Sequence, residues 1–381
     1  MKKIIGFCLQ ILFGLFPIKK NKILFETCNG EVKDHLKAIY DYMKHQEIDD
    51  YDFKWVITKG NDISAIQGNE IVYRKTIGYF YHLLTSHYWM RTHSVSTIVK
   101  KREGQIYIQL WHGPGAIKKE GFDIEGVENT GETVFHAKEW DYFIATDEIC
   151  QRYIQSATNI RIPRILLGSC RSDALINANQ DKYYTLRADM GVTLEEKLVL
   201  YAPTFRDKDL ETSSVSLKIK ELCKQEGIRV VLRLHPWVKE RLNIKEYDSS
   251  VIDGNQYASI MDLYLASDIL ITDYSSVSIE YALLKKPILY YMYDLNDYEV
   301  ERGFYYNYLD HLAGPIIKTE EELIRAVLEI DKVVGDYREK YEAYNHRYNR
   351  HNDGHVCERF CAMLMQGEFD EQQSKKNSMR G

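Results

Sequence analysis

Short apolar runs alternate with helical patterns from Lys22 onward, and this alternation constrains the fold more than any other feature of the sequence. It is typical of helices layered on a mostly parallel sheet. The first series of expected strands covers residues 23–26, 53–57, 94–99, 106–111, 142–145 and 164–167. The second series covers residues 198–201, 229–234, 251–252, 269–271 and 288–291. We therefore predict an α/β fold.

The break between the two series, near residues 191–197, indicates two domains, and a length of 381 residues agrees with that division. We expect two Rossmann-like domains that face each other across a cleft, where small-molecule sites are common. The expected parts are an N-terminal helix at 1–20, domains at 21–190 and 191–335, a C-terminal helix at 336–366 that could return to the first domain, and a disordered polar tail at 367–381.

One strand of the second series leads into a turn that is rich in hydroxyl groups. The apolar run 269–271 is followed by the sequence Thr-Asp-Tyr-Ser-Ser, which ends in Ser275 and Ser276, and then by a helical pattern up to Pro287. Free N–H groups at a helix start, together with serine hydroxyls, form a site that suits a phosphate. Serine is also a common helix cap whatever the function, so the turn alone leaves both interpretations open.

Two other strand ends in the same series carry cationic side chains. Arg206 follows the strand at 198–201, and Arg233 and His235 end the strand at 229–234. A guanidinium group matches the geometry of a phosphate, although pairing with a carboxylate is the competing explanation for either arginine. Together with the serine turn, these residues predict a pyrophosphate site in the second domain.

A histidine in the first domain is the candidate base. The strand at 106–111 runs into the sequence Trp-His-Gly-Pro-Gly, which places His112 in a loop, and Lys118 follows shortly after. Histidine has the unperturbed pKa that best suits the removal of a proton near neutrality. A surface histidine without a role is the alternative. If His112 faces the pyrophosphate site, it would deprotonate an attacking hydroxyl while the cations stabilise a leaving phosphate.

The composition narrows the class of partners. A net charge of −6 argues against a general nucleic-acid binder, and the seven scattered cysteines are typical of reduced cytosolic thiols. Cys357 and Cys361, with His351 and His355 just before them, could hold a metal ion, but the sequence has no second ligand cluster with zinc-like spacing. We expect no obligatory metal and no cofactor.

The N-terminus carries an apolar segment from Ile4 to Ile18, which is interrupted only by Gln10 and followed by a cluster of lysines. A bilayer span takes roughly 20 residues, so the segment is too short, and it lacks the small-residue cleavage site of a secretory signal. We expect an interfacial helix whose apolar side chains enter the acyl region and whose lysines meet anionic headgroups. A first helix packed on its own domain is the alternative.

The motifs, in their order and spacing, add a family resemblance. They are Trp111-His112-Gly113 with Lys118-Lys119 and Gly121-Phe122-Asp123, Tyr201-Ala202-Pro203-Thr204-Phe205-Arg206, Arg233-Leu234-His235-Pro236, Thr272-Asp273-Tyr274-Ser275-Ser276 and Arg302-Gly303-Phe304-Tyr305. On these motifs the chain resembles the CDP-glycerol glycerophosphotransferase family of bacterial teichoic acid synthesis, from Lys19 to about Cys361.

The resemblance implies a GT-B architecture and a peripheral enzyme on the cytoplasmic face of the cell membrane. It implies transfer of glycerol phosphate from CDP-glycerol to a hydroxyl of a membrane-bound, lipid-linked glycan acceptor, with release of CMP. By the same resemblance, His112 would act as the base on the acceptor hydroxyl. His235, Ser275 and Ser276 would hold the pyrophosphate of the donor.

Further residues have secondary roles in this interpretation. Arg206 and Arg233 are additional candidates for the donor phosphates, and Gly113 and Lys118 belong to the loop on the acceptor side. Glu280 lies one turn into the helix after the serine turn, and from that geometry we expect it to reach the ribose hydroxyls.

One motif departs from the family pattern. The common family loop has Thr-Pro after His-Gly and reaches its lysine sooner, whereas here Pro114-Gly115-Ala116-Ile117 precedes Lys118. Because that loop faces the acceptor, the acceptor and the number of units added stay open. A CDP-ribitol ribitolphosphotransferase, a nucleotide-sugar GT-B glycosyltransferase or epimerase, and a catalytically idle membrane-binding scaffold are the alternative functions.

Overall fold

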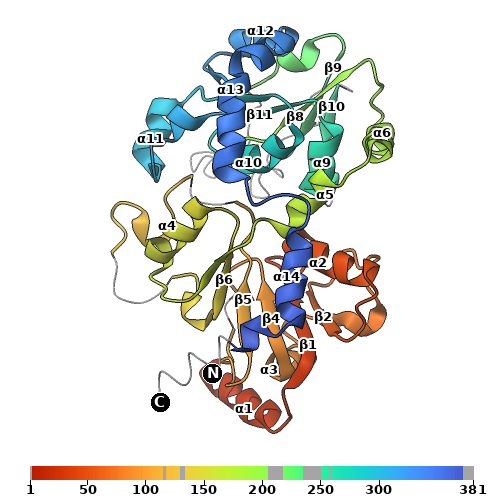
Figure 1. The fold of residues 1–381 in the computed structure, drawn as a ribbon, viewed down its shortest axis with the longest axis vertical. Coiled ribbons are helices and arrows are strands. Elements are labelled where there is room, and N and C mark those ends of the chain that lie inside the picture. Colours follow the sequence, from red (N-terminus) through yellow and green to blue (C-terminus); the bar gives the residue numbers. More distant parts are fainter. Residues whose placement is uncertain are drawn as a thin grey trace. The chain divides into compact units, whose positions relative to one another are not determined.

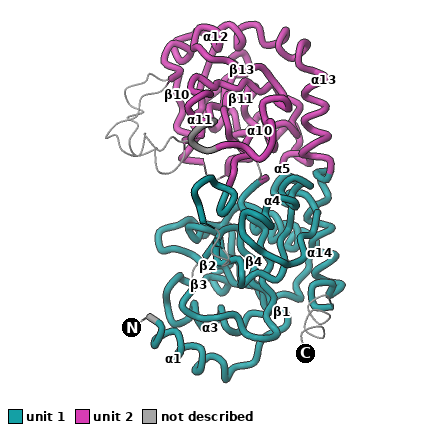
Figure 2. Tube along the Cα trace, turned by 90° about the vertical axis from the view of Figure 1, so that its left-hand side faces the viewer, with its two compact units in different colours: residues 1–113, 120–173, 351–381 teal, residues 114–119, 174–350 magenta. Residues whose placement is uncertain are grey.

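The computed structural model describes residues 2–95, 97–114, 117–128, 134–204, 218–234, 250–257 and 259–371. The chain forms two compact units (Figure 2). Unit 1 comprises residues 1–113, 120–173 and 351–381, and unit 2 comprises residues 114–119 and 174–350. Each unit contains one parallel β-sheet with helices packed on it (Figure 1). The predicted α/β fold is therefore confirmed.

Unit 1 is built on a seven-stranded sheet with the order β3-β2-β1-β4-β5-β6-β7, in which every pair is parallel. Its strands are β1 (Lys19–Glu26), β2 (Asp52–Ile57), β3 (Ile71–Tyr73), β4 (Ser86–Arg91), β5 (Ile106–Gln109), β6 (Tyr142–Ala145) and β7 (Arg164–Leu166). Its helices include α1 (Lys2–Gly14), α2 (Asp34–His45), α3 (Ile77–Thr85), α4 (Glu148–Thr158) and α14 (Val356–Met365).

The core of unit 1 lies on both faces of this sheet. On one face, α2 and α14 lie side by side (Figure 1) and contribute Leu36 and Phe360 to one apolar cluster. On the other face, α1, α3 and α4 contribute Phe13, Leu83 and Ile154 to a second cluster. Strands covered on both faces are apolar along their length, which explains why β5 and β6 are recognisable in the sequence.

Unit 2 is built on a six-stranded parallel sheet with the order β10-β9-β8-β11-β12-β13. Its strands are β8 (Lys197–Tyr201), β9 (Ile228–Leu232), β10 (Val251–Asp253), β11 (Ile269–Thr272), β12 (Ile288–Tyr291) and β13 (Ile316–Ile317). Its helices include α6 (Gln180–Asp189), α9 (Ile260–Ala266), α10 (Val277–Tyr281), α11 (Leu295–Arg302), α12 (Glu320–Leu328) and α13 (Ile330–Tyr348). The short 3₁₀ helices include η4 (Cys170–Ser172), in unit 1, and η9 (Tyr308–His311), in unit 2.

Most of the expected strands agree with the structure, but the one at 94–99 is wrong. The described part of that segment forms no strand, and the strand before β5 is β4 at Ser86–Arg91. Its sequence, Ser-His-Tyr-Trp-Met-Arg, looks polar at its ends, yet the whole strand is buried. The burial is tolerated because His87 Nδ1 lies 2.7 Å from the carbonyl of Gly104 and Arg91 pairs with Glu26 at 2.6 Å.

The C-terminal region also differs from the expectation of one helix at 336–366. Two helices, α13 and α14, are separated by a break, and Asp173 caps the second one by accepting hydrogen bonds from the N–H groups of Val356 and Cys357 at 3.1 and 2.7 Å. The expected disorder from residue 367 is wrong for the first residues of the tail. Phe369 is buried in the core of unit 1 and Asp370 lies 2.8 Å from His87, while residues 372–381 lie outside the described part.

Candidate functional site

The carboxyl ends of the central strands of unit 1 carry a buried ionic cluster. The register of the sheet pairs Glu26 at the end of β1 with Arg91 at the end of β4, and Arg91 with Gln109 at the end of β5. The Glu26 carboxylate is fully buried and contacts Arg91 at 2.6 Å and Arg74 at 3.2 Å. A buried carboxylate needs such compensation. The cluster fixes the edge of the sheet from which the next residues project.

His112 projects from this edge directly after β5. Trp111 adopts a left-handed conformation with φ of 59°, and its side chain is buried while that of His112 is exposed. The N–H of Trp111 donates to Gln109 Oε1 at 3.1 Å, which holds the turn at the strand end. A non-glycine residue in this region of φ is uncommon and worth attention at a candidate site.

A second histidine lies against the first. His93, which follows β4, stacks on His112 with ring centroids 4.4 Å apart and planes 15° apart. The backbone carbonyl of His93 accepts a hydrogen bond from Gln109 Nε2 at 3.3 Å. The ring nitrogen Nδ1 of His93 lies 3.0 Å from Thr92 Oγ1. Because β4 and β5 are neighbouring strands, the sheet itself brings the two rings together.

An ion pair supports the loop after His112. Arg171, in η4, pairs with Asp34 at the start of α2 at 2.7 Å. Gly113 has a φ of 143°, and a Cβ atom built there would lie 2.7 Å from Nη2 of Arg171. The loop therefore needs glycine at this position, both for its conformation and for the close approach of the guanidinium group.

The electrostatics of the cluster favour neutral histidines. The His112 ring reaches solvent, but desolvation by the protein atoms around it, followed by repulsion from His93, lowers its pKa to about 3. Desolvation likewise lowers the pKa of His93 to about 4 and that of the fully buried His35 to about 3. Neither ring nitrogen of His35 has a hydrogen-bond partner among the described residues. At neutral pH, the His112 ring is therefore neutral, and one of its two nitrogens carries no proton and can accept one.

The loop after Gly113 continues into unit 2. Lys118 forms an antiparallel bridge with Phe304, and the N–H of Tyr305 donates to the carbonyl of Ile117 at 3.1 Å. Residues 115–116 lie outside the described part of the chain. The structure therefore brings Gly113 together with His112, whereas the backbone of Lys118 is held by residues of unit 2.

The serine turn of unit 2 follows β11 as expected. Asp273 Oδ1 accepts hydrogen bonds from the N–H groups of Thr204 and Tyr274 at 2.9 and 2.6 Å, so it joins the ends of β8 and β11. Ser275 and Ser276 are half-buried. Ser276 occupies the cap position of α10 but makes no capping hydrogen bond through its side chain. Ser275 Oγ accepts a hydrogen bond from the N–H of Val277 at 3.5 Å, so the interpretation as a helix cap fits Ser275 but not the side chain of Ser276.

The other donor-side candidates have different surroundings. Arg233 Nη1 donates to the carbonyls of Gly254 and Tyr257, both at 2.8 Å, and so holds the loop after β10. Glu280 is only 1% exposed. Arg206 and His235 lie outside the described residues.

Sequence reasoning missed three residues that surround His112, namely His93, Asp34 and Arg171. Arg171 belongs to a polar turn that reads as a junction between domains, and His93 lies just before the segment that was wrongly expected to be a strand. No cluster of metal-binding side chains offers a stronger signal, because among the described residues no group of three or more His, Cys, Asp or Glu could hold a metal. Cys357 and Cys361 are buried in the core of unit 1.

The sequence matches known proteins over most of its length. Residues 9–366 match the family described as CDP-Glycerol:Poly(glycerophosphate) glycerophosphotransferase. A teichoic acid glycerol-phosphate transferase of Staphylococcus aureus (strain NCTC 8325 / PS 47) is 30% identical, over 96% of this chain and 98% of the relative. A teichoic acid poly(glycerol phosphate) polymerase of Staphylococcus epidermidis is 31% identical over 87% of this chain, which spans about half (48%) of that polymerase. Relatives named as ribitol-phosphate primase and poly(ribitol-phosphate) polymerase also match.

Solved structures agree with these matches. The wall teichoic acid polymerase TagF superposes with a TM-score of 0.85 at 28% identity, over 97% of both chains. A variant of TagF has also been solved after a soak with CDPG. A UDP-GlcNAc 2-epimerase of Neisseria meningitidis shares the fold alone, at 14% identity and a TM-score of 0.51. The predicted GT-B type of fold is thereby confirmed.

Proposed function

Because the chain belongs to the CDP-glycerol:poly(glycerophosphate) glycerophosphotransferase family, we propose that it transfers glycerol phosphate from CDP-glycerol to a hydroxyl of an acceptor and releases CMP. The observation that carries this proposal is the exposed imidazole of His112, which desolvation keeps neutral and His93 holds in a stack. A neutral imidazole at the end of a strand has an unprotonated nitrogen with which it can act as the base of such a transfer.

In the proposed step, the acceptor hydroxyl gives its proton to His112 as its oxygen attacks the phosphorus that carries the glycerol. The bond between this phosphorus and the oxygen that bridges the two phosphates breaks, and CMP leaves with the electron pair. The product is a phosphodiester between the glycerol and the acceptor. The base supplies no charge to the leaving group, so cations on the donor side must stabilise it.

For the donor side, we assign the pyrophosphate to the turn of unit 2 with Ser275 and Ser276, together with Arg206 and His235. This assignment is supported by the hydroxyl of Ser276, which does not cap α10 although it occupies the cap position. Arg233 has a smaller part in it, because its Nη1 is committed to two backbone carbonyls. The buried Glu280 would reach a ribose only if the donor opened a path to it.

The acceptor is proposed to be lipid-linked, with the enzyme bound peripherally to the cytoplasmic face of the cell membrane. Among the described residues, no helix is both long enough and apolar enough to span a bilayer. One face of α1 and the residues after it nevertheless exposes a continuous set of large apolar side chains, namely Ile4, Ile5, Phe7, Ile11, Leu12, Leu15 and Phe16. Such a face, followed by the exposed Lys19 and Lys20, suits a membrane surface.

The opposite face of α1 is fixed to unit 1. Gly6 approaches the backbone so closely that a Cβ atom would lie 2.0 Å from the carbonyl oxygen of Ile98. Gln10 exchanges two hydrogen bonds with the backbone of Lys100, at 3.1 and 2.9 Å, and Arg102 donates to the carbonyls at the end of the helix. The apolar face is therefore held at the surface by packing on the other side, which favours a docking role over simple burial.

A CDP-ribitol donor is the second candidate, because relatives named for ribitol phosphate match this chain as well. Ribitol differs from glycerol only by additional hydroxymethylene groups.

The deciding experiment is a donor panel with lipid-linked acceptors, in which the mass of the product is measured. We expect product only from CDP-glycerol, and none from UDP-sugars. The variant His112→Asn should still bind CDP-glycerol but release no CMP. Turnover by this variant at the wild-type rate would overturn the role of His112, and full activity in excess chelator would support a reaction without an obligatory metal.

A further inference from the structure

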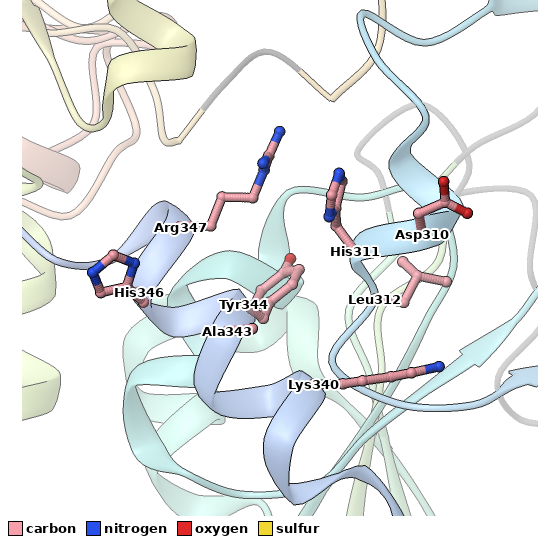
Figure 3. Close-up of a pocket in the computed structure, with 8 residues that line it drawn as sticks. All are labelled: Asp310, His311, Leu312, Lys340, Ala343, Tyr344, His346 and Arg347. Atoms are coloured by element: carbon pink, nitrogen blue, oxygen red, sulfur yellow. The ribbon is translucent and has the colours of Figure 1, made fainter.

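We infer that unit 2 has a second phosphate-binding site, in the pocket between the C-terminal half of α13 and η9. The pocket has a volume of about 340 Å³ and is lined by Asp310, His311, Leu312, Lys340, Ala343, Tyr344, His346 and Arg347. Figure 3 shows Arg347 and His311 extending to the same side above Tyr344, whereas Lys340 lies at the other end and His346 points away. All of these residues belong to unit 2, so the pocket is complete within one compact unit.

Two cationic side chains line the pocket. Neither Arg347 nor Lys340 forms an ion pair with a carboxylate in the described part of the chain, and both lie over aromatic rings. The acidic lining residue, Asp310, accepts a hydrogen bond from Asn307. Other cations of α12 and α13 do pair, as Arg325 does with Glu321 and Lys332 with Glu329. In a chain with a net charge of −6, two unpaired cations in one pocket indicate a site for an anion.

The histidine of the pocket adds little standing charge. Desolvation, followed by repulsion from Arg347, lowers the pKa of His311 below its ordinary value of 6.5. The ring is therefore mostly neutral at neutral pH and can either donate or accept a hydrogen bond. The positive charge beside His311 comes from Arg347, while Lys340 adds positive charge at the other end of the pocket.

Aromatic rings hold the side chain of Arg347 in place. The guanidinium carbon of Arg347 lies 4.9 Å from the ring centre of Tyr306 and 5.6 Å from that of Tyr348. Its Nε is buried and has no hydrogen-bond partner among the described residues. A guanidinium held by rings with its N–H groups unused loses little entropy when it binds, and its fork matches two oxygens of a phosphate.

Hydrogen bonds connect the pocket to the serine turn. Ser278 Oγ donates to the carbonyl of Ser275 at 3.0 Å, so its single proton is used. Tyr344, at the floor of the pocket, must therefore donate its hydroxyl proton to Ser278 Oγ, at 2.8 Å. Two consecutive hydrogen bonds thus join the floor of the pocket to the turn that we assign to the donor pyrophosphate.

The ligand that fits these features is a phosphate group that carries a small polar substituent. A phosphodiester of a glycerol phosphate chain and a phosphate of CDP-glycerol share this chemistry, and the choice between them rests on the proposed function. The inference of an anion site in the pocket does not rest on the proposed function, because it requires only an anion of the size of a phosphate group. A volume of about 340 Å³ is at the lower end of the usual range for small-molecule sites and suits one such unit.

The test is direct binding to the full chain, without turnover. Inorganic phosphate, CDP-glycerol and a fluorescent glycerol phosphate oligomer are titrated against the wild type and against Arg347→Gln. The matched control is Arg338→Gln, because Arg338 is an exposed arginine of the same helix outside the pocket and the change in charge is identical. Arg347→Gln should weaken binding of the oligomer or of CDP-glycerol about tenfold, and Arg338→Gln should leave it unchanged.

The three ligands distinguish the possible origins of the bound phosphate, and they distinguish failure of the pocket from failure of the proposed function. Weakening for the oligomer alone assigns the pocket to the acceptor chain, weakening for CDP-glycerol alone assigns it to the donor, and weakening for inorganic phosphate alone retains the anion site even if the proposed function fails. Equal affinities for Arg347→Gln and the wild type, or equal losses in both glutamine variants, would overturn the site. Thermal unfolding is measured for each variant to show that it is folded. If Arg347→Gln does not fold, Lys340→Gln serves as a second variant.

Discussion

The imidazole rings of His93 and His112 stack with their centroids 4.4 Å apart and their planes 15° apart. The first ring follows β4 and the second follows β5, which are neighbouring parallel strands. Aromatic stacks of this kind contribute about 0.5–1.5 kcal/mol beyond the burial of area. The orientation of the proposed base is therefore set by a residue of the adjacent strand end and not by its own loop alone.

This stack predicts different effects for two substitutions of His93. His93→Ala removes the ring and should lower kcat for CMP release about tenfold, with little change in the KM for CDP-glycerol. His93→Phe keeps a ring in place and should retain most of the activity. Equal losses in the two variants, measured as steady-state CMP release, would show that the stack does not orient His112.

Buried histidines of this cluster predict that stability falls in acid. Burial lowers the pKa of His35 from 6.5 to about 3 in the folded state, whereas the unfolded chain binds its proton near the ordinary pKa. The stabilising contribution is thus fully present above pH 6.5 and is lost as the pH falls toward 3, at up to about 1.4 kcal/mol per pH unit.

The variant His35→Leu should flatten this part of the pH dependence, measured as the urea midpoint at a series of pH values. The control is His355→Leu, since His355 is exposed on the surface of unit 1. If His35→Leu left the slope unchanged, the acid sensitivity would have to arise from other groups.

Gly113 links the conformation of the loop to the ion pair behind it. In Gly113→Ala, the φ of 143° would be unfavourable for the alanine. The new Cβ atom would also lie 2.7 Å from Arg171 Nη2, which cannot easily move because Asp34 holds the guanidinium in place. We expect a loss of about 1–3 kcal/mol in the free energy of unfolding and a larger loss of CMP release. In Gly126→Ala, the glycine has a φ of 81° and open space around it, so stability should fall without the loss of activity. Similar activity in the two variants would contradict a role for this contact.

The elements that the sequence predicts are those whose pattern depends on local burial. Strands such as β6 and β12, which are apolar throughout, are found with their correct ends. β4 could not be found in the same way, because its His87 and Arg91 are buried only through partners elsewhere in unit 1, namely Gly104, Asp370 and Glu26. Because its ends are polar, the sequence of β4 does not show the apolar pattern expected of a central strand.

In the candidate site too, the features with a local sequence pattern are predicted and those that depend on distant partners are not. The histidine after a strand and the serine turn have signatures within a few residues, and the sequence identifies both. The support of His112 by His93, and the contact of Arg171 with Asp34 and Gly113, join segments that lie far apart in the chain. No local pattern encodes them, since they depend on the strand order of the sheet.

The apolar face of α1 gives the prediction about the membrane. Phe7 is 65% exposed on that face, so Phe7→Ser should leave the fold intact while it removes about 1.5–3 kcal/mol of apolar transfer from water to the acyl region. Binding to vesicles that contain anionic lipid, measured by co-sedimentation, should fall about tenfold or more. Leu328→Ser is the control, because Leu328 is 55% exposed on α12 of unit 2 and should not matter. Co-sedimentation that survived deletion of residues 2–20 would refute docking through this helix, since the exposed apolar residues of α1 would then contribute nothing to the binding.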